Sequence, residues 1–82
     1  MNKEFNAIEF LELLNLIDKN YQLLKQDASS LQCYLNLKDS LKKLDYLIQN
    51  KLIPSDILFK TIKFYYDYYR LMETTYIKIK LK

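Results

Sequence analysis

The sequence contains no glycine, no valine and no histidine, and it has one proline and one cysteine. Glycine adopts positive φ at low cost, so its absence excludes hairpins with tight two-residue turns, glycine-rich phosphate loops and dinucleotide-binding fingerprints. Valine is a strong strand former, whereas leucine, which favours helices, is the most frequent residue here. We therefore expect an all-α protein.

The missing histidine also removes several kinds of active site. A Ser–His–Asp triad, a Cys–His pair and a typical zinc site each need residues that this chain lacks. Glu9 and Glu12 lie three residues apart, and we expect them on a solvated helix face. We therefore identify no catalytic residue, no metal site and no cofactor site, and we expect a protein that is not an enzyme.

The single cysteine and the apolar runs bear on the compartment. Cys33 has no second cysteine for an internal disulfide, which fits a reducing compartment, and we treat this residue as a small, half-buried hydrophobe. No apolar run approaches the roughly 20 residues that cross a bilayer, so we expect no membrane span and no signal peptide. The expected location is cytoplasmic.

The composition also carries a signature of the source genome. Phe, Tyr, Met, Ile, Asn and Lys make up 40 of the 82 residues, whereas Gly, Ala, Arg and Pro make up four. The first group has AT-rich codons and the second GC-rich codons, which favours an AT-rich genome as the source, such as that of a low-GC bacterium, its phage or plasmid, or a comparable eukaryotic parasite. Net charge is divided unevenly, with −2 over residues 1–37 and +5 over residues 38–82. Such an asymmetry can steer a charged partner.

Apolar spacing predicts a first helix over residues 4–27 and a second over residues 30–50. Steps of three and four place one stripe of each segment on a single helix face. A polar patch from Asp27 to Ser30 separates the two segments, and Ser29 or Ser30 can cap the second helix. The two stripes are Phe10, Leu13, Leu14, Ile17, Tyr21 and Leu24 in the first segment, and Tyr34, Leu37, Leu41, Leu44 and Ile48 in the second.

A third helix is predicted over residues 55–76. We expect Asn50 to take the left-handed conformation at the end of the second helix, Pro54 to bar its continuation, and Ser55 to cap the third helix. Residues 77–82 alternate apolar side chains with lysine, and we expect a frayed basic tail there or a strand that pairs with a partner. The apolar face of the third helix is wide: Leu58, Ile62, Tyr65, Tyr69, Met72 and Tyr76, flanked by Ile57, Phe64, Tyr68 and Leu71.

These segments predict a single domain over residues 1–82 with the fold of an antiparallel three-helix bundle. The break at residues 27–30 contains neither glycine nor proline, which leaves an alternative open. In that alternative, residues 4–50 form one long helix and a dimer completes the core with the C-terminal helices.

Four residues of the third helix are candidates for binding a partner. Phe59 and Tyr66 point about 80–100° away from the main apolar stripe, and they align with Lys63 and Arg70 in steps of four, three and four. Aromatic side chains and arginine are enriched in interface hot spots. Two alternatives are that this face packs beneath the first helix and that codon bias placed tyrosine on the surface. Asp67 and Arg70, three apart, are expected to form an ordinary ion pair.

The first helix has apolar residues outside its main stripe. Phe5, Leu16 and Leu23 group on one flank, and Ile8 and Leu11 on the other. We expect the first group to face the third helix, or else to form an exposed patch through which the chain associates with itself, for example as a homodimer.

The function predicted from the sequence is non-catalytic binding to another protein, whose identity the sequence does not encode. Adaptor, immunity and inhibitor proteins of phages and plasmids fit this description by association. The alternative is an accessory protein that binds nucleic acid through the basic C-terminal half. That alternative is weaker because the third helix begins with Asp56 and apolar residues where base contacts would lie.

Overall fold

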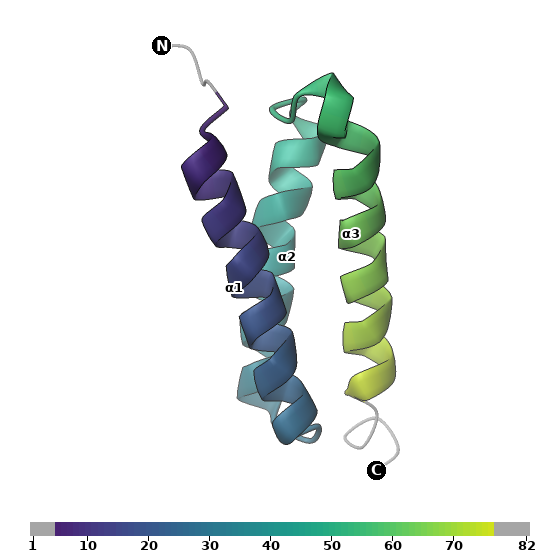
Figure 1. Ribbon diagram of the computed structural model, residues 1–82. Coiled ribbons are helices and arrows are strands. Elements are labelled where there is room, and N and C mark those ends of the chain that lie inside the picture. The colour runs from purple at the N-terminus through teal and green to yellow at the C-terminus, as the bar shows by residue number, and fades with distance from the viewer. Residues whose placement is uncertain (1–4, 77–82) are drawn as a thin grey trace.

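A computed structural model describes residues 5–76 of the chain as three helices that run alternately down, up and down (Figure 1). Helix α1 spans Ala7–Gln26, α2 spans Leu31–Gln49 and α3 spans Ser55–Thr75. Each helix packs against both of the others, and the described residues include no strand. The predicted all-α, antiparallel three-helix bundle is confirmed. The predicted tail over 77–82 lies outside the described residues. The first helix begins later than predicted, at Ala7, because the side chain of Asn6 accepts the Glu9 N–H and caps the helix there.

The connection between α1 and α2 is a short turn that ends one helix and caps the next. The backbone N–H of Asp27 donates to the carbonyl oxygens of Leu23 and Leu24, which closes the last turn of α1. The hydroxyl of Ser30 accepts the backbone N–H of Cys33 at 3.1 Å, which satisfies a free donor at the start of α2. The alternative of one long helix over residues 4–50 is therefore wrong.

The connection between α2 and α3 differs from the prediction in two details. Asn50 has φ −94°, and Lys51 is the residue with positive φ, at 58°. Asn50 instead donates a hydrogen bond from its side-chain amide to the carbonyl oxygen of Tyr46 at 2.8 Å. Pro54, not Ser55, occupies the cap position of α3, and no side chain caps that helix. The ring of Pro54 fixes φ near −56°, which presets the chain for entry into the helix.

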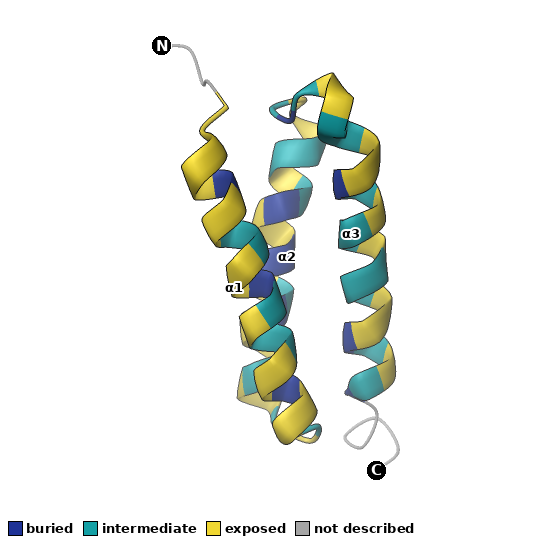
Figure 2. Cartoon of the chain, viewed as in Figure 1, coloured by how far each residue is buried: buried dark blue, intermediate teal, exposed yellow. Residues whose placement is uncertain are grey.

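The core lies along the shared axis of the three helices, where the dark blue segments of Figure 2 face inward. The stripes predicted for the first two helices are buried or half-buried, as expected. The wide apolar face predicted for α3 is likewise buried or half-buried, except for Leu71, which is 39% exposed. Thr61, which the apolar pattern missed, is buried and donates its hydroxyl to the carbonyl oxygen of Ile57. The buried apolar residues are Phe10, Ile17, Leu24, Leu37, Leu41, Leu44, Ile53, Met72 and Tyr76.

Polar contacts fix the heights of the helices relative to one another. The Tyr68 hydroxyl on α3 donates to Asp18 on α1 at 2.6 Å, and the Tyr34 hydroxyl on α2 donates to Glu73 on α3 at 3.1 Å. Burial, followed by the hydrogen bond to Asp18 and its charge, raises the pKa of Tyr68 to about 12. Burial and the corresponding contacts with Glu73 raise the pKa of Tyr34 to about 12. Both bonds need the protonated phenol, so the fold favours it.

Candidate protein-interaction surface

The four residues predicted to bind a partner lie together on the solvent side of α3. We call Phe59, Lys63, Tyr66 and Arg70 the outer α3 face. All four are exposed, with 79% of Phe59 and 61% of Tyr66 accessible to solvent. The flank of α3 that meets α1 is a different one, because it carries Tyr68 bonded to Asp18. The outer α3 face therefore does not pack beneath α1.

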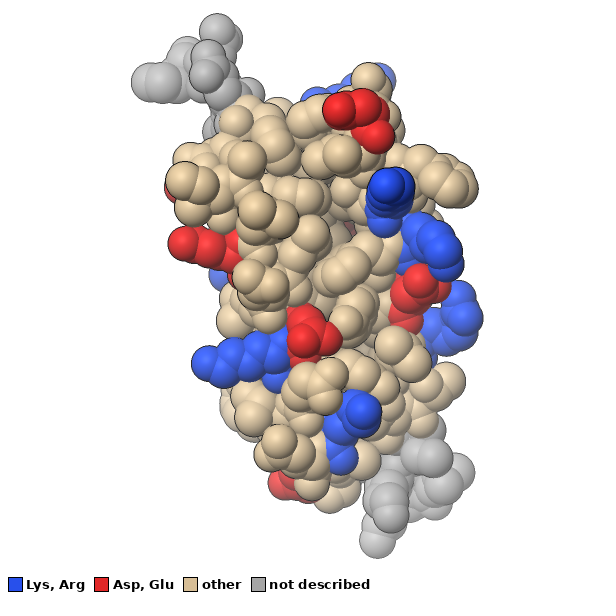
Figure 3. Space-filling view, in the orientation of Figure 1, with Lys and Arg blue, Asp and Glu red and all other residues tan. Residues whose placement is uncertain are grey.

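Asp67 holds the two cations of the outer α3 face in place. The Lys63 ammonium donates to one carboxylate oxygen at 3.1 Å, and the Arg70 guanidinium donates to the other at 3.4 Å. The expected pair between Asp67 and Arg70 is thus present, and Lys63 joins it. Such exposed pairs contribute little to stability. They instead bring the two cationic groups to either side of Asp67, and the three side chains together carry one net positive charge. In Figure 3, blue and red groups alternate along the edge that α3 forms.

The Tyr66 ring contacts the ring of the preceding residue, Tyr65. Its centroid lies 5.2 Å from that of Tyr65, and the two ring planes are tilted by 75°. Tyr65 is half-buried, and burial followed by the nearby charge of Asp45 raises its pKa above the usual value of 10.0. Tyr65 is therefore a neutral, half-buried side chain in edge-to-face contact with Tyr66. This arrangement orients Tyr66 while leaving most of it in solvent.

The residues predicted for self-association lie on a different surface. Leu16 and Leu23 share the flank of α1 that carries Asn20, whose amide donates to the Asn36 carbonyl oxygen and the Ser40 hydroxyl of α2. The expectation that this group faces the third helix is wrong for Leu16 and Leu23, because the flank of α1 toward α3 carries Asp18 and Tyr21. Phe5, in contrast, lines an opening that α3 residues also line. Leu16 and Leu23 are each 40% exposed, and Phe5 is 36% exposed. They border the outer surface where α1 meets α2, which we call the α1/α2 face.

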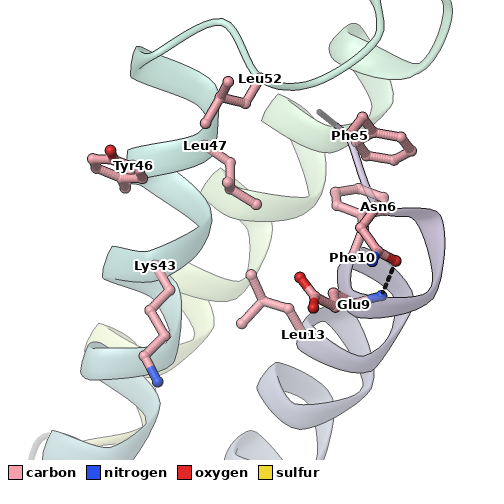
Figure 4. Close-up of a pocket in the computed structure, with 9 residues that line it drawn as sticks. All are labelled: Phe5, Asn6, Glu9, Phe10, Leu13, Lys43, Tyr46, Leu47 and Leu52. Atoms are coloured by element: carbon pink, nitrogen blue, oxygen red, sulfur yellow. Dashed lines mark hydrogen bonds between the residues drawn. The ribbon is translucent and has the colours of Figure 1, made fainter. Parts of the chain in front are cut away.

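An opening of about 470 Å³ lies at one end of the α1/α2 face. Figure 4 shows Leu13 of α1 and Leu47 of α2 projecting into this opening, with Lys43 and Tyr46 on the α2 side and Glu9 on the α1 side. The Phe5 ring packs against Phe10 with 5.2 Å between the centroids. The complete lining is Phe5, Asn6, Glu9, Phe10, Leu13, Lys43, Tyr46, Leu47 and Leu52.

A second opening of about 370 Å³ lies between α1 and α3 and was not anticipated. It is lined by Leu11 and Leu14 of α1 and by Ile57, Lys60 and Phe64 of α3, among others. The front of the molecule in Figure 3 is mostly uncharged over this region. Both openings exist because α1 leans away from its neighbours toward its N-terminal end (Figure 1). The hydrophobic pattern of the sequence defines the apolar face of each helix but not the tilt between helices. The only sequence signal for the two openings was the set of apolar residues outside the main stripe of the first helix.

Three other side chains could in principle act as acids, nucleophiles or metal ligands. Glu9 and Glu12 are exposed, as expected, and Cys33 is a half-buried free thiol. Between residues 5 and 76, no three His, Cys, Asp or Glu side chains gather closely enough to hold a metal ion. Within the same part of the chain, no helix combines the length and apolar character needed to cross a bilayer.

No protein-family model matches the sequence, and no curated protein and no solved structure shows significant similarity to it. The side chains themselves therefore supply the basis for assigning a function.

Proposed function

We propose that the protein is a small, non-catalytic, cytoplasmic module that binds another protein through the outer α3 face. One observation carries the proposal. Phe59 and Tyr66 are large aromatic side chains that stand in solvent and add little to the core. Phe59 is the most exposed large hydrophobic residue between residues 5 and 76. An exposed aromatic pair flanked by cations has the composition of an interface hot spot.

The preset geometry of the outer α3 face supports the same proposal. Asp67 orients Lys63 and Arg70, and Tyr65 supports Tyr66. Any restriction that these contacts impose before binding would lower the entropic cost of association. The complementary surface on the partner is an apolar groove that accepts the two rings, with acidic groups at its rim that pair with Lys63 and Arg70. An adaptor, an immunity protein or an inhibitor encoded by a low-GC bacterium, phage or plasmid fits this description.

Nucleic-acid binding through the basic C-terminal half is the alternative proposal. Tyr66 and Phe59 could stack on bases, and Lys63 and Arg70 could contact phosphates. The cluster of Lys63, Asp67 and Arg70 carries only one net positive charge, however, and this disfavours binding to a phosphate backbone, which takes several cations. A salt series in a filter-binding assay separates the two, because phosphate-driven binding weakens steeply as salt increases. Retention of nucleic acid at about 50 mM salt that disappears by about 200 mM would support the alternative.

The experiment for the main proposal compares two double variants in affinity capture from the native host. Phe59→Ala with Tyr66→Ala removes both aromatic side chains of the outer α3 face. Ile8→Ala with Leu11→Ala removes two exposed apolar side chains from α1 and serves as the matched control. We expect the first variant to lose a specific partner that the wild type and the control retain, with unchanged helix content in all three. Equal capture by both variants would contradict the proposal.

A further inference from the structure

We propose that two copies of the chain form a twofold dimer through the α1/α2 face, with α1 of each copy packed against α2 of the other. This inference is independent of the outer α3 face, which stays free in such a dimer. It rests on two stripes of exposed residues that match each other in height, in apolar character and in charge. One stripe is Glu12, Leu16, Lys19 and Leu23 on α1, and the other is Leu35, Asp39, Lys43 and Tyr46 on α2.

Each stripe runs along one side of its helix. Steps of four, three and four on α1, and of four, four and three on α2, keep the residues within one flank. All eight side chains are exposed. The apolar members Leu16, Leu23 and Leu35 are 40–45% exposed, and Leu13 and Leu47 line the opening between the same two helices.

The heights of the two stripes follow from contacts within one chain. Asn20 of α1 is bonded to Asn36 and Ser40 of α2, so Lys19 is level with Asp39. By the same antiparallel count, Leu23 is level with Leu35. Near the other end, Lys43 and Tyr46 line the same opening as Glu9 and Leu13, which places Glu12 at the height of that turn of α2.

A twofold axis parallel to the helices preserves these heights across the interface. Rotation about such an axis moves each residue sideways but not along the axis, and it places α1 of one copy opposite α2 of the other. Leu23 then meets Leu35 of the second copy, and Lys19 meets Asp39. Glu12 lies near Lys43 of the second copy, with an offset along the helix axis of at most one helical turn. Every contact occurs twice.

The charges favour a second copy over an unrelated partner. Glu12, Lys19, Asp39 and Lys43 form no ion pair with any of residues 5–76, in contrast to Lys63 and Arg70 of the outer α3 face. In the dimer, Lys19 lies opposite Asp39, and Glu12 lies within about one helical turn of Lys43, a distance that the long lysine side chain can span. Rim pairs of this kind contribute little affinity, but they specify orientation. The apolar residues Leu16, Leu23 and Leu35 supply the affinity.

Sedimentation equilibrium of the full chain tests the dimer. We expect a species of twice the 10.0 kDa chain mass. Leu16→Lys should weaken the dimer by at least about 30-fold, as expected for a hot-spot position. Leu11→Lys is the matched control, because Leu11 is exposed on the opposite flank of the same helix; this variant should remain dimeric. Circular dichroism confirms that both variants keep their helices. A wild type that stays at 10.0 kDa, or equal weakening by both variants, would overturn the proposal.

Charge reversal tests the arrangement of the two copies. Glu12→Lys alone places lysine opposite Lys43 at both sites, and Lys43→Glu alone places glutamate opposite Glu12 at both sites. Each variant should therefore dimerise more weakly than the wild type. An equimolar mixture should recover the dimer, because a heterodimer places opposite charges at both sites. No recovery in the mixture would refute the packing of α1 against α2. Phe59→Ala with Tyr66→Ala should dimerise normally, which separates this test from that of partner binding.

Discussion

Replacement of Phe59 by alanine should leave the fold almost unchanged while removing partner binding. A phenylalanine side chain buries about 200 Å² when it is completely covered. Because 79% of Phe59 is exposed, only about a fifth of that area, roughly 40 Å², is lost in the variant. At about 25 cal/mol/Å² the loss is about 1 kcal/mol. The higher helix propensity of alanine offsets about 0.5 kcal/mol of it.

Met72→Ala provides the contrast on the same helix. Met72 is fully buried, and its truncation should cost about 2–5 kcal/mol. Urea unfolding followed by circular dichroism measures both values. A typical slope of about 1 kcal/mol per M for a small domain converts them to midpoint shifts of about 0.5 M for Phe59→Ala and 2 M or more for Met72→Ala. A Phe59→Ala shift as large as that of Met72→Ala would show that Phe59 is structural and refute its assignment to the interaction surface.

Three further predictions concern stability. The folded-state pKa of about 12 for Tyr34 and Tyr68 lies above the unfolded value of 10.0, so their contribution is complete below pH 10 and is lost as the pH rises through 12. The difference of about 2 between the folded and unfolded pKa values limits the contribution of each tyrosine to the free energy of unfolding to about 2.7 kcal/mol. Solvent screening at these half-buried rings reduces that contribution to roughly 1 kcal/mol. Urea midpoints measured across this range should fall less steeply for Tyr68→Phe than for the wild type; an unchanged slope would contradict the assignment. Lys51→Gly should raise the free energy of unfolding by about 0.5–1 kcal/mol, because glycine adopts φ 58° without the steric cost that lysine incurs; a lower urea midpoint would contradict it. Ser30→Ala should lower the thermal midpoint, since the lost cap to the Cys33 N–H is typically worth about 1 kcal/mol, and a midpoint equal to that of the wild type would show that the cap does not contribute.

The sequence predicted the helices well because their apolar spacing is regular. The stripes around Ile17 and Leu41 are buried as expected, and both breaks between helices fall where polar residues or Pro54 interrupt the pattern. The details of the breaks were harder. Positive φ falls on Lys51 instead of Asn50, because the closing turn of α2 places its reversal one residue later.

The neighbour that each flank meets could not be predicted. The third helix of a three-helix bundle can pack on either side of the first two, which gives a left-handed or a right-handed bundle. Both arrangements bury the same apolar stripes. The flank of α1 that carries Leu16 therefore borders α2 in one arrangement and α3 in the other. The structure resolves the choice through Asn20 and Asp18, which contact α2 and α3 respectively. The breadth of the apolar face on α3 has the same origin, since each helix touches two neighbours and half-buries both flanks.

The exposure of Phe59 and Tyr66 was predictable, in contrast, because their angle from the main stripe is a property of the helix alone. The position of Asp67 between Lys63 and Arg70 follows from the same spacing. The tilt of α1, which creates the two openings, depends on the packing of all three helices and has no local signal.

Site-specific photo-crosslinking in the native host tests most directly whether the outer α3 face holds a protein partner. A photoreactive phenylalanine analogue at position 59 or 66 should yield one discrete covalent adduct with another protein. The same analogue at position 8, which is also exposed but lies on α1, should not yield that adduct. Adducts absent from positions 59 and 66, or equally strong at position 8, would contradict the account.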